Sequence, residues 1–494
     1  MFVTRAGLLG TSAAALFVLS AVIARGLPSA PKATPAAAGR PNVVLVIWDT
    51  ARADHQSVYG YRRDTTPFLR SFAETATLYQ HSFAASDMTL SSSASIFTGL
   101  YASWHGAYFS RTAPYGRPLA GKYQTIAEAL RDGGYTTMAV LANCSYLARA
   151  YALDQGFQLY DVRTPVGSDA IAHRYYLRAA LQKLLAPVVR TGELDRRFRR
   201  GDEITTDALK LLESRRGAGP FFLTLNYMDV HLPYLPPPPY DTLYPGRDSS
   251  TFEELQNLRR EVLQLRRPPT AREQAHLISQ YDGAMAYLDS QFQRLVGGLK
   301  QLGLYDSTLI VLTADHGEAL GERHLLEHAV SVYEDQVHVP LIVKYPNQAT
   351  RAVATTPVSG IDIMPTILDV AGIAPAQPPQ GRSLRQPDES RTILSESFRS
   401  GLLAGWHPRF DRVERAVVSG PMKLIRSTAG KHELYNLATD PEEATNLFGN
   451  KPFAGAELER AMAAMLAIAP PDSAPGRSTN KQELQRLRSL GYAQ

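Results

Sequence analysis

Two acidic residues and a histidine in this chain lie where a protein could bind a metal ion. Asp315 and His316 follow an apolar run, Thr308–Thr313, and Asp49 ends a second one, Asn42–Trp48. Runs of branched apolar residues are typical of strands buried on both faces of a parallel sheet. Open α/β sheets bind ligands at the carboxyl edge, so we expect the three side chains to meet there. The structural alternative is that each aspartate only caps a following helix.

Strands and helices alternate around these residues from Pro41 to about Gly372. The pattern predicts further strands at residues 136–141, 221–225 and 340–344, and helices at residues 66–76, 125–130 and 273–302. Strands that alternate with helices form a mostly parallel sheet covered on both faces. We therefore predict an α/β domain with a mostly parallel central sheet sandwiched by helices.

After about Ile373 the pattern changes to short strands and turns. Strands predicted at residues 392–397, 415–419, 422–426 and 433–437 indicate a small antiparallel sheet, followed by a helix at 452–468 and a tail helix that ends at Gly491. Two polar, arginine-rich segments, 162–216 and 241–272, are predicted to be less regular insertions over the active face, with their paired arginines on solvated helix faces. The domain prediction is residues 1–40 as leader or anchor plus linker, 41–372 as the catalytic α/β domain and 373–494 as a C-terminal α+β subdomain.

Composition sets further limits. The chain has 494 residues, 44% hydrophobic and 20% charged, which is enough for one large and one smaller globular domain. A net charge of +5 is small for this length, and no aromatic residues interleave with the paired arginines, so we expect no nucleic-acid partner. Cys144 is the only cysteine, which excludes a cysteine-based metal site.

The N-terminus has the pattern of a targeting segment. Arg5 precedes an uncharged run, residues 6–24, and Arg25 follows it. This run fits either a signal peptide or a single marginal membrane span, and the Ala- and Pro-rich residues 28–39 fit a flexible spacer. We therefore expect the folded part to be extracytoplasmic, periplasmic or secreted, with residues 6–24 as a possible single-span anchor.

From Pro41 onward the chain resembles the sulfatase branch of the alkaline phosphatase superfamily. The matching segments are short but occur in the family's order: 42–49, 91–99, 105–106, 134–137, 156–157, 221–234, 281–289, 313–318, 339–341, 362–366 and 433–442. The resemblance implies the fold of that superfamily and a metal-dependent ester hydrolase.

The nucleophile position departs from the family pattern. Sulfatases carry Cys-x-Pro-Ser-Arg, or Ser in place of Cys, and oxidise the first residue to formylglycine. Counting back from Thr98-Gly99 places Thr89 there, followed by Leu90 and then Ser91-Ser92-Ser93. A threonine does not fit the modification, so no formylglycine is expected. Threonine is the nucleophile in phosphodiesterases and in phosphoglycerol and phosphoethanolamine transferases of the superfamily. The resemblance thus implies a phosphoryl-transfer nucleophile on a sulfatase scaffold.

Thr89 also lies at the expected start of a short helix, residues 91–97, which Gly99 ends. Unpaired N–H groups at a helix N-terminus favour the negative oxygens of a transferring group. The structural alternative is that Thr89 is an ordinary N-cap. Ser91 and Ser92 are the rival nucleophiles.

By resemblance, one divalent ion is bound by a set of side chains that comprises Asp49, Thr89, Asp315 and His316. An imidazole beside two carboxylates favours Mn²⁺ or Zn²⁺ over Ca²⁺. Metal binding lowers the pKa of a hydroxyl, which makes threonine a competent nucleophile. A second ion would need about three further ligands. His231 and His328 would supply two, and no third carboxylate stands out, so one ion is favoured.

The resemblance also gives roles to other polar residues. His231 would contact the charged group of the substrate and protonate the leaving oxygen. His328 lies where family members carry a Lys or His near the leaving group. Many sulfatases carry a Gly-Lys pair in the segment where this chain has Asn143. Asn143 would donate a hydrogen bond to a transferring oxygen. Ser91 is a second candidate for substrate binding. The alternative for each histidine is a structural hydrogen-bonding role.

Together these features predict a hydrolase that cleaves a phosphate or phosphonate ester, including diesters, through a covalent Thr89 intermediate. The expected substrate is a small anionic ester, with lipid and glycan headgroups among the candidates. One alternative is sulfuric ester hydrolysis without formylglycine. Others are transfer to an alcohol, as in the phosphoglycerol and phosphoethanolamine transferases, and a non-catalytic protein that keeps the metal site.

Overall fold

The computed structural model describes residues 39–164, 198–250, 252–386, 388–449 and 452–467. The predicted leader or anchor and the predicted tail helix lie outside the described residues. Within the described part of the chain, no helix is long and apolar enough to cross a membrane.

A central sheet of eight strands carries the fold, in the order β11-β2-β10-β7-β1-β6-β4-β5 within the described residues. The strands from β7 to β5 are parallel to one another, whereas β10 is antiparallel to both of its neighbours. The bounds are β1 (Asn42–Trp48), β2 (Thr77–Tyr79), β4 (Thr136–Leu141), β5 (Leu159–Asp161), β6 (Phe221–Tyr227), β7 (Thr308–Thr313), β10 (Leu341–Lys344) and β11 (Ala352–Ala354). The prediction of a mostly parallel sheet is confirmed.

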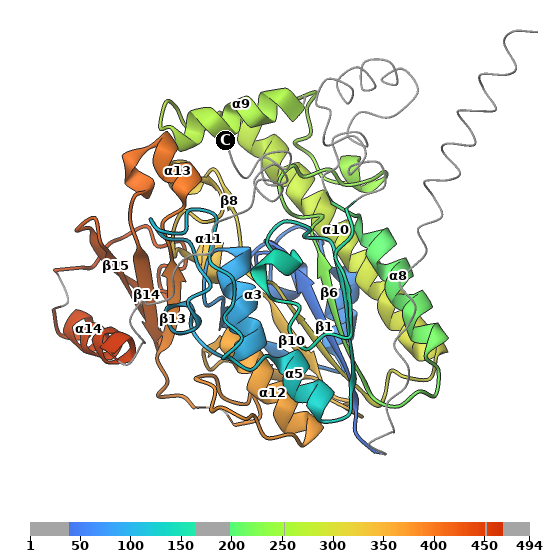
Figure 1. Ribbon diagram of the computed structural model, residues 1–494. Helices are drawn as coiled ribbons and strands as arrows, with labels where there is room; N and C mark the ends of the chain where they lie inside the picture. Colours follow the sequence, from blue (N-terminus) through green and yellow to red (C-terminus); the bar gives the residue numbers. More distant parts are fainter. Residues whose placement is uncertain (1–38, 165–197, 251, 387, 450–451, 468–494) are drawn as a thin grey trace, which may run out of the picture.

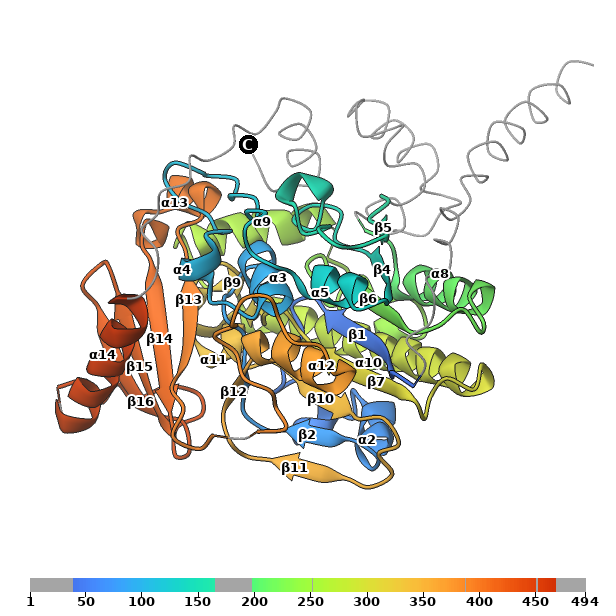
Figure 2. The same cartoon turned by 60° about the horizontal axis from the view of Figure 1, so that its bottom comes forward.

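Helices cover both faces of this sheet (Figures 1 and 2). Alternate residues of β1 enter two separate apolar cores, as expected for a strand buried on both faces. One core contains side chains of α2 (Pro67–Ala73), α8 (Gly201–Ser214) and α10 (Ala271–Gln301). The other contains side chains of α3 (Thr89–Thr98), α5 (Ile126–Asp132) and α12 (Ile363–Ala371). This α/β sandwich fixes the carboxyl ends of β1 and β7 side by side.

Capping residues define the long helices. Thr270 and Glu273 form a capping box at the start of α10, and Thr125 and Glu128 form one at the start of α5. Helix α3 ends at Gly99, whose φ of 66° is a left-handed conformation that glycine adopts at little cost.

The two segments predicted to be less regular each contain a helix among the described residues. Helix α8 lies within 162–216, and α9 (Phe252–Leu263) lies within 241–272. Both bury apolar side chains at helical spacing: Ile204, Ala208, Leu211 and Leu212 on α8, and Leu255, Leu258 and Val262 on α9. In Figure 1, α9 lies above the carboxyl ends of the parallel strands, on the side where the sheet carries its functional residues.

The C-terminal part forms an antiparallel sheet of β13 (Ile393–Ser397), β14 (Glu414–Ser419), β15 (Met422–Ser427) and β16 (His432–Asn436). Helix α14 (Pro452–Ala467) packs on it through Leu458 and Met462. The predicted antiparallel sheet is confirmed. Shorter elements are β3 (Ser82–Phe83), β8 (Ala319–Leu320), β9 (Leu326–Glu327), β12 (Val358–Ser359), α4 (Ala102–His105), α11 (Glu334–Val337) and α13 (Gly401–Trp406).

The buried Lys423 on β15 joins this sheet to the catalytic part, since it pairs with Glu334 on α11 at 2.7 Å and with Glu443 at 2.8 Å.

Candidate active site

Asp49, Asp315 and His316 meet at the carboxyl ends of β1 and β7, where the sequence predicted them. One ligand atom of each lies within 4.8 Å of those of the other two. His316 Nε2 is 3.5 Å from Asp315 Oδ2 and 4.0 Å from Asp49 Oδ1. All three side chains are fully buried. The parallel pairing of β1 with β7 brings these residues together, although more than half of the chain separates them in sequence.

Each aspartate uses one carboxylate oxygen for internal hydrogen bonds. Asp49 Oδ2 accepts from the side-chain amides of Asn143 at 2.9 Å and Asn226 at 3.3 Å. Asp315 Oδ1 accepts from the backbone N–H groups of Thr50 at 3.3 Å and His316 at 3.0 Å. Neither aspartate caps a helix, which excludes the structural alternative. The other two oxygens, Asp49 Oδ1 and Asp315 Oδ2, are buried and have no hydrogen-bond partner among the described residues.

The tautomer of His316 follows from its neighbour. Its Nδ1 lies 2.9 Å from the carbonyl oxygen of Gly317, which can only accept, so Nδ1 carries the proton. The lone pair of Nε2 therefore points toward the two aspartates. Burial lowers the pKa of His316, and His328 lowers it further. Burial and the nearby charge of Asp49 raise the pKa of Asp315.

This arrangement fits a divalent cation. Two carboxylate oxygens without partners and one imidazole lone pair converge in a buried space. Buried carboxylates are stable only when paired or bound to a metal. The hydrogen bonds of the outer oxygens and of Nδ1 orient the three ligands, as partners of metal ligands commonly do.

Thr89 faces the same space. It is the first residue of α3, after the extended Met88, and its Oγ1 lies 3.2 Å from His316 Nε2. Met88 occupies the N-cap position, so Thr89 is not the N-cap threonine of the structural alternative. Ser92 Oγ donates to the backbone oxygen of Asp315 at 2.5 Å, which ties α3 to the end of β7. The N–H groups of the first helical turn lack intrahelical acceptors and face the helix N-terminus.

The structure does not bring Ser91 to this space. Its Oγ donates to Ser86 Oγ at 2.7 Å. Two residues along a helix correspond to about 200° of rotation, so Ser91 lies on the opposite side of α3 from Thr89. Asn143 does reach the site, but as a support for a ligand. Its Nδ2 donates to Asp49, and its Oδ1 accepts from the backbone N–H groups of Ser145 and Tyr146 at 3.1 and 3.0 Å.

Two further histidines lie beside the metal ligands, as the resemblance implied. The ring centroid of His328 is 4.5 Å from that of His316 and 5.0 Å from that of His231. His231 Nδ1 donates to the carbonyl oxygen of Leu232 at 2.7 Å. Burial lowers the pKa of His328. Both side chains are buried beside the candidate metal ligands.

Sequence reasoning missed two residues near these histidines. Glu318 is fully buried, and its Oε1 lies 3.7 Å from His328 Nδ1. Burial raises the pKa of Glu318 to about 8. Arg259 on α9 pairs with Glu327 at 2.5 Å and lies over the ring of Trp406 at 4.6 Å. The available signals were the Glu that completes Asp-His-Gly-Glu and the helical spacing of apolar residues around Arg259.

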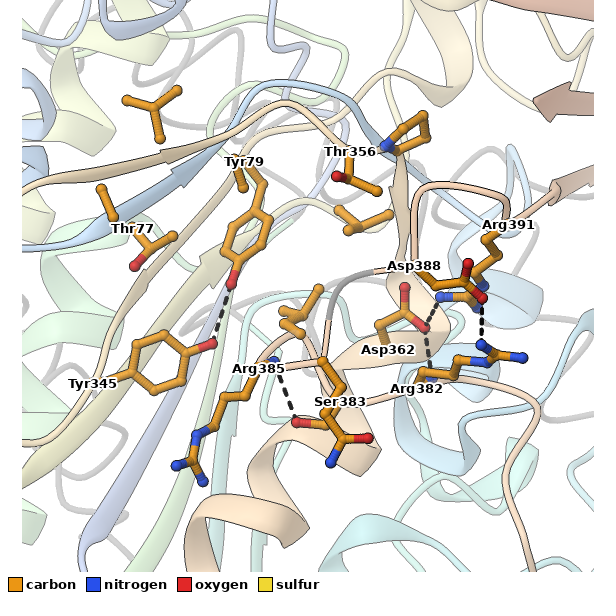
Figure 3. Close-up of a pocket in the computed structure, with 17 residues that line it drawn as sticks. Thr77, Tyr79, Tyr345, Thr356, Asp362, Arg382, Ser383, Arg385, Asp388 and Arg391 are labelled. Carbon is orange, nitrogen blue, oxygen red and sulfur yellow. Dashed lines mark hydrogen bonds and ion pairs between the residues drawn. The ribbon is translucent and has the colours of Figure 1, made fainter. Parts of the chain in front are cut away.

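A separate hollow of about 260 Å³ lies at the far edge of the sheet, beside β2 and β11 (Figure 3). Its charged residues largely neutralise one another: Arg391 pairs with Asp362 at 2.6 Å and Arg382 pairs with Asp388. It follows the end of β10, which is antiparallel to β7, so it lies away from the metal ligands. It is not part of the candidate active site.

Comparison with known proteins agrees with this geometry. The sulfatase family model matches residues 41–373, and the model of the N-sulphoglucosamine sulphohydrolase C-terminal region matches residues 321–467. The fold, the site and these matches define an ester hydrolase of the alkaline phosphatase superfamily. Within that class, the chain belongs to the sulfatase family. Members of this family are metal-dependent, in keeping with the converging ligands described above.

The individual relatives have low sequence identity to this chain, but the matches cover most of its length. The chain is 24% identical over 435 residues to the uncharacterized sulfatase YidJ of Escherichia coli, covering 84% of each chain. It is 22% identical to an arylsulfatase of Clostridium perfringens, covering 84% of this chain and 91% of the relative. Among solved structures, the phosphonate monoester hydrolase of Agrobacterium radiobacter matches with a TM-score of 0.66 and 20% identity, covering 87% of this chain and 96% of that one. The Silicibacter pomeroyi phosphonate monoester hydrolase matches with a TM-score of 0.64 and 25% identity, covering 87% and 95%.

Proposed function

We propose that this protein hydrolyses a phosphate or phosphonate ester, including diesters, with Thr89 as the nucleophile. The observation that carries the proposal is the position of the Thr89 hydroxyl, at the N-terminus of α3 and 3.2 Å from His316 Nε2. Two structural neighbours named as phosphonate monoester hydrolases support this substrate class. A relative from Trinickia caryophylli, 27% identical over 298 residues, is named a multifunctional alkaline phosphatase superfamily protein.

One divalent ion would be held by Asp49, Asp315, His316 and the Thr89 hydroxyl. Because an imidazole accompanies the two carboxylates, we propose Mn²⁺ or Zn²⁺ in preference to Ca²⁺. Such an ion supplies positive charge that lowers the pKa of the hydroxyl and offsets the negative charge of the substrate.

Each side chain then has a separate role in the proposed reaction. Thr89 loses its hydroxyl proton to solvent, and its Oγ1 forms a bond to phosphorus while the bond from phosphorus to the ester oxygen breaks. The leaving oxygen takes a proton from a histidine, and His231 and His328 are the two candidates that flank the site. N–H groups of the first turn of α3 stabilise the negative phosphoryl oxygens. Water then displaces Thr89 from phosphorus, and the threonine regains its hydroxyl proton.

Sulfuric ester hydrolysis is the second candidate, because the family match and the curated relatives cited above are sulfatases. Sulfate and phosphate esters present similar tetrahedral anionic centres, so one site can accept both. Against it stands Thr89, which occupies the position where sulfatases carry the precursor of formylglycine. We also propose that the enzyme acts outside the cytoplasm on a small anionic ester, on the basis of the targeting pattern in residues 5–25.

The test is to prepare the protein metal-free and reload it with Mn²⁺, Zn²⁺ or Ca²⁺. Each form is assayed with aryl phosphodiester, phosphonate monoester, phosphomonoester and sulfate substrates. We expect diester or phosphonate cleavage with Mn²⁺ or Zn²⁺ and its loss in Thr89→Ala. Sulfate cleavage at an equal or higher rate would overturn the substrate assignment.

A further inference from the structure

His328 is held in an unusual backbone turn. Its two neighbours, Glu327 and Ala329, have φ values of 65° and 61°, in the left-handed region that residues other than glycine rarely occupy. Such strain persists only where surrounding contacts enforce it, and it concentrates at functional sites. The contacts are present: the Glu327 carboxylate pairs with Arg259, and the Ala329 N–H donates to the backbone oxygen of Asp87 at 3.0 Å.

The ring of His328 has a defined environment. It packs against His316 on one side and His231 on the other, with centroids 4.5 and 5.0 Å away. Its Nδ1 is buried and has no hydrogen-bond partner within 3.5 Å among the described residues. The nearest acidic group is Glu318, whose Oε1 lies 3.7 Å from that nitrogen.

Glu318 is the acidic residue that lies beside this nitrogen. It is fully buried, and neither of its carboxylate oxygens meets the geometry of a hydrogen bond to a described residue. The side chains that act on its charge are His231, Glu327 and Asp49, together with the hydroxyl groups of Thr50 and Tyr234. Gly317 alone separates it in sequence from the candidate metal ligand His316, and its side chain is fully buried. Burying a carboxylate is costly unless other groups compensate its charge, so its presence beside His328 calls for an explanation.

A second metal site does not explain the cluster. Within the described ranges, the set Asp49, Asp315 and His316 is the only one whose ligand atoms all lie within 4.8 Å of one another. Glu318, His231 and His328 do not meet that spacing. Glu318 Oε1 instead lies 3.7 Å from Nδ1 of His328, and the charge of His231 also acts on this carboxylate.

We propose that Glu318 is a positioning residue that holds the Nδ1–H of His328 and so directs its Nε2 to the leaving oxygen of the ester. This inference rests on the function proposed above. The separation of 3.7 Å closes to a hydrogen bond when the substrate fills the site, as catalytic hydrogen bonds commonly tighten in the substrate complex.

The proton balance follows from this arrangement. In the first half of the reaction, His328 Nε2–H gives its proton to the leaving oxygen as the bond from phosphorus to that oxygen breaks. In the second half, Nε2 takes a proton from the water that attacks the phosphorylated Thr89. The Nδ1 proton stays on the ring and faces Glu318 throughout, so no further reactant is required.

The test compares Glu318→Gln with a matched control, Glu322→Gln. Glu322 lies on the same loop, and its carboxylate pairs with Arg52 at 2.7 Å and makes no contact with a histidine. Both variants are assayed on esters of one phosphonate whose leaving groups run from dinitrophenol to phenol and methanol. Activated phenols leave without a proton, whereas methanol needs one. We expect the loss in Glu318→Gln to grow along this series, from small to about 100-fold, the usual size of general acid catalysis.

A purely structural role would lower every rate by a similar factor in Glu318→Gln, and this result would overturn the proposal. Glu322→Gln should show no dependence on the leaving group. Metal content is measured in both variants, and a loss of bound metal in Glu318→Gln would make it a ligand and also contradict the proposal.

A second measurement needs no turnover. Nitrogen-15 spectra of labelled histidines, with the His328 signals identified from His328→Gln, report which ring nitrogen carries the proton in neutral His328. We expect Nδ1–H in the wild type and a shift toward Nε2–H in Glu318→Gln. A wild-type Nε2–H tautomer would overturn the proposal even if every ester assay failed. Failure of all ester assays alone would refute the proposed function and leave this tautomer result to decide the role of Glu318.

Discussion

The substitution Asp49→Asn separates two effects of the candidate metal site on stability: the repulsion between its buried carboxylates without metal and the stabilisation gained when metal binds. The amide oxygen of the new side chain can still accept from Asn143 and Asn226, which now hold Asp49 Oδ2 at 2.9 and 3.3 Å. The substitution therefore keeps the fold-supporting contacts. It removes one of two buried negative charges and replaces the inward oxygen, Oδ1, with an NH₂ group that cannot bind a cation.

The magnitude follows from the geometry. Two unit charges about 5 Å apart repel by roughly 3 kcal/mol at an effective dielectric constant of about 20. Because the pKa of Asp315 is already raised, partial protonation relieves some of this repulsion. We expect the metal-free variant to be as stable as the metal-free wild type or more stable, by about 1 to 3 kcal/mol. An ion at about 100 times its Kd stabilises the wild type by about 2.7 kcal/mol, and this gain should disappear in the variant.

The assay is thermal unfolding of both proteins after chelation and again after addition of Mn²⁺ or Zn²⁺, with bound metal measured by elemental analysis. The wild type should gain several degrees with metal and the variant should gain almost none. Asn143→Ala is a useful comparison, because it keeps the charge of Asp49 and removes one of its supports. A metal-free Asp49→Asn protein that is clearly less stable than the metal-free wild type, or that keeps the full metal-induced gain, would refute the reasoning.

Three further predictions concern the nucleophile, pH and the helix above the site. Thr89→Ala should lower kcat/KM by at least about 10⁴-fold while the metal stays bound, whereas Ser91→Ala should stay within about threefold, so equal losses would contradict the assignment. Burial raises the pKa of Asp289 to about 7, so the folded state binds more protons than the unfolded state between about pH 4 and 7, and stability from this group is lost as pH rises through 7. Denaturant titrations should therefore show that the free energy of unfolding of Asp289→Asn rises relative to that of the wild type from pH 5 to pH 8, by up to about 1.4 kcal/mol per pH unit below pH 7. A difference in unfolding free energy that does not change with pH would contradict this prediction. Arg259→Met should lower kcat about tenfold with little change in bound metal, because the freed Glu327 no longer holds the turn at His328; an unchanged kcat would show that the ion pair has no role in the reaction.

The convergence of the candidate metal ligands could be predicted because parallel strands impose their geometry. Once β1 and β7 are recognised as neighbours, Asp49, Asp315 and His316 must emerge at one edge, and no side-chain detail is needed. The same reasoning located the central and C-terminal sheets. Helices α8 and α9 carry a helical spacing of apolar residues, but they lie in polar, arginine-rich segments, so the sequence predicted less regular insertions and did not give the bounds of either helix.

The roles of individual polar residues depended on orientation, which the sequence does not specify. Ser91 is two residues from Thr89, and only the observed start of α3 shows that its hydroxyl points to Ser86. Asn143 reaches the site, but whether its amide meets a ligand or a substrate depends on the neighbouring strand β6. Glu318 was overlooked because no pattern of spacing in the sequence shows that it lies beside His328.

Mass analysis of the enzyme during turnover tests the central claim most directly. Protein loaded with Mn²⁺ or Zn²⁺ is mixed with an aryl phosphonate or phosphodiester, quenched in acid and digested. The account predicts a phosphoryl or phosphonyl group on the peptide that contains Thr89, absent in Thr89→Ala. A substrate that is cleaved while the group is found on Ser91 or Ser92, or while oxygen-18 exchange shows direct attack by water with no covalent adduct, would contradict it.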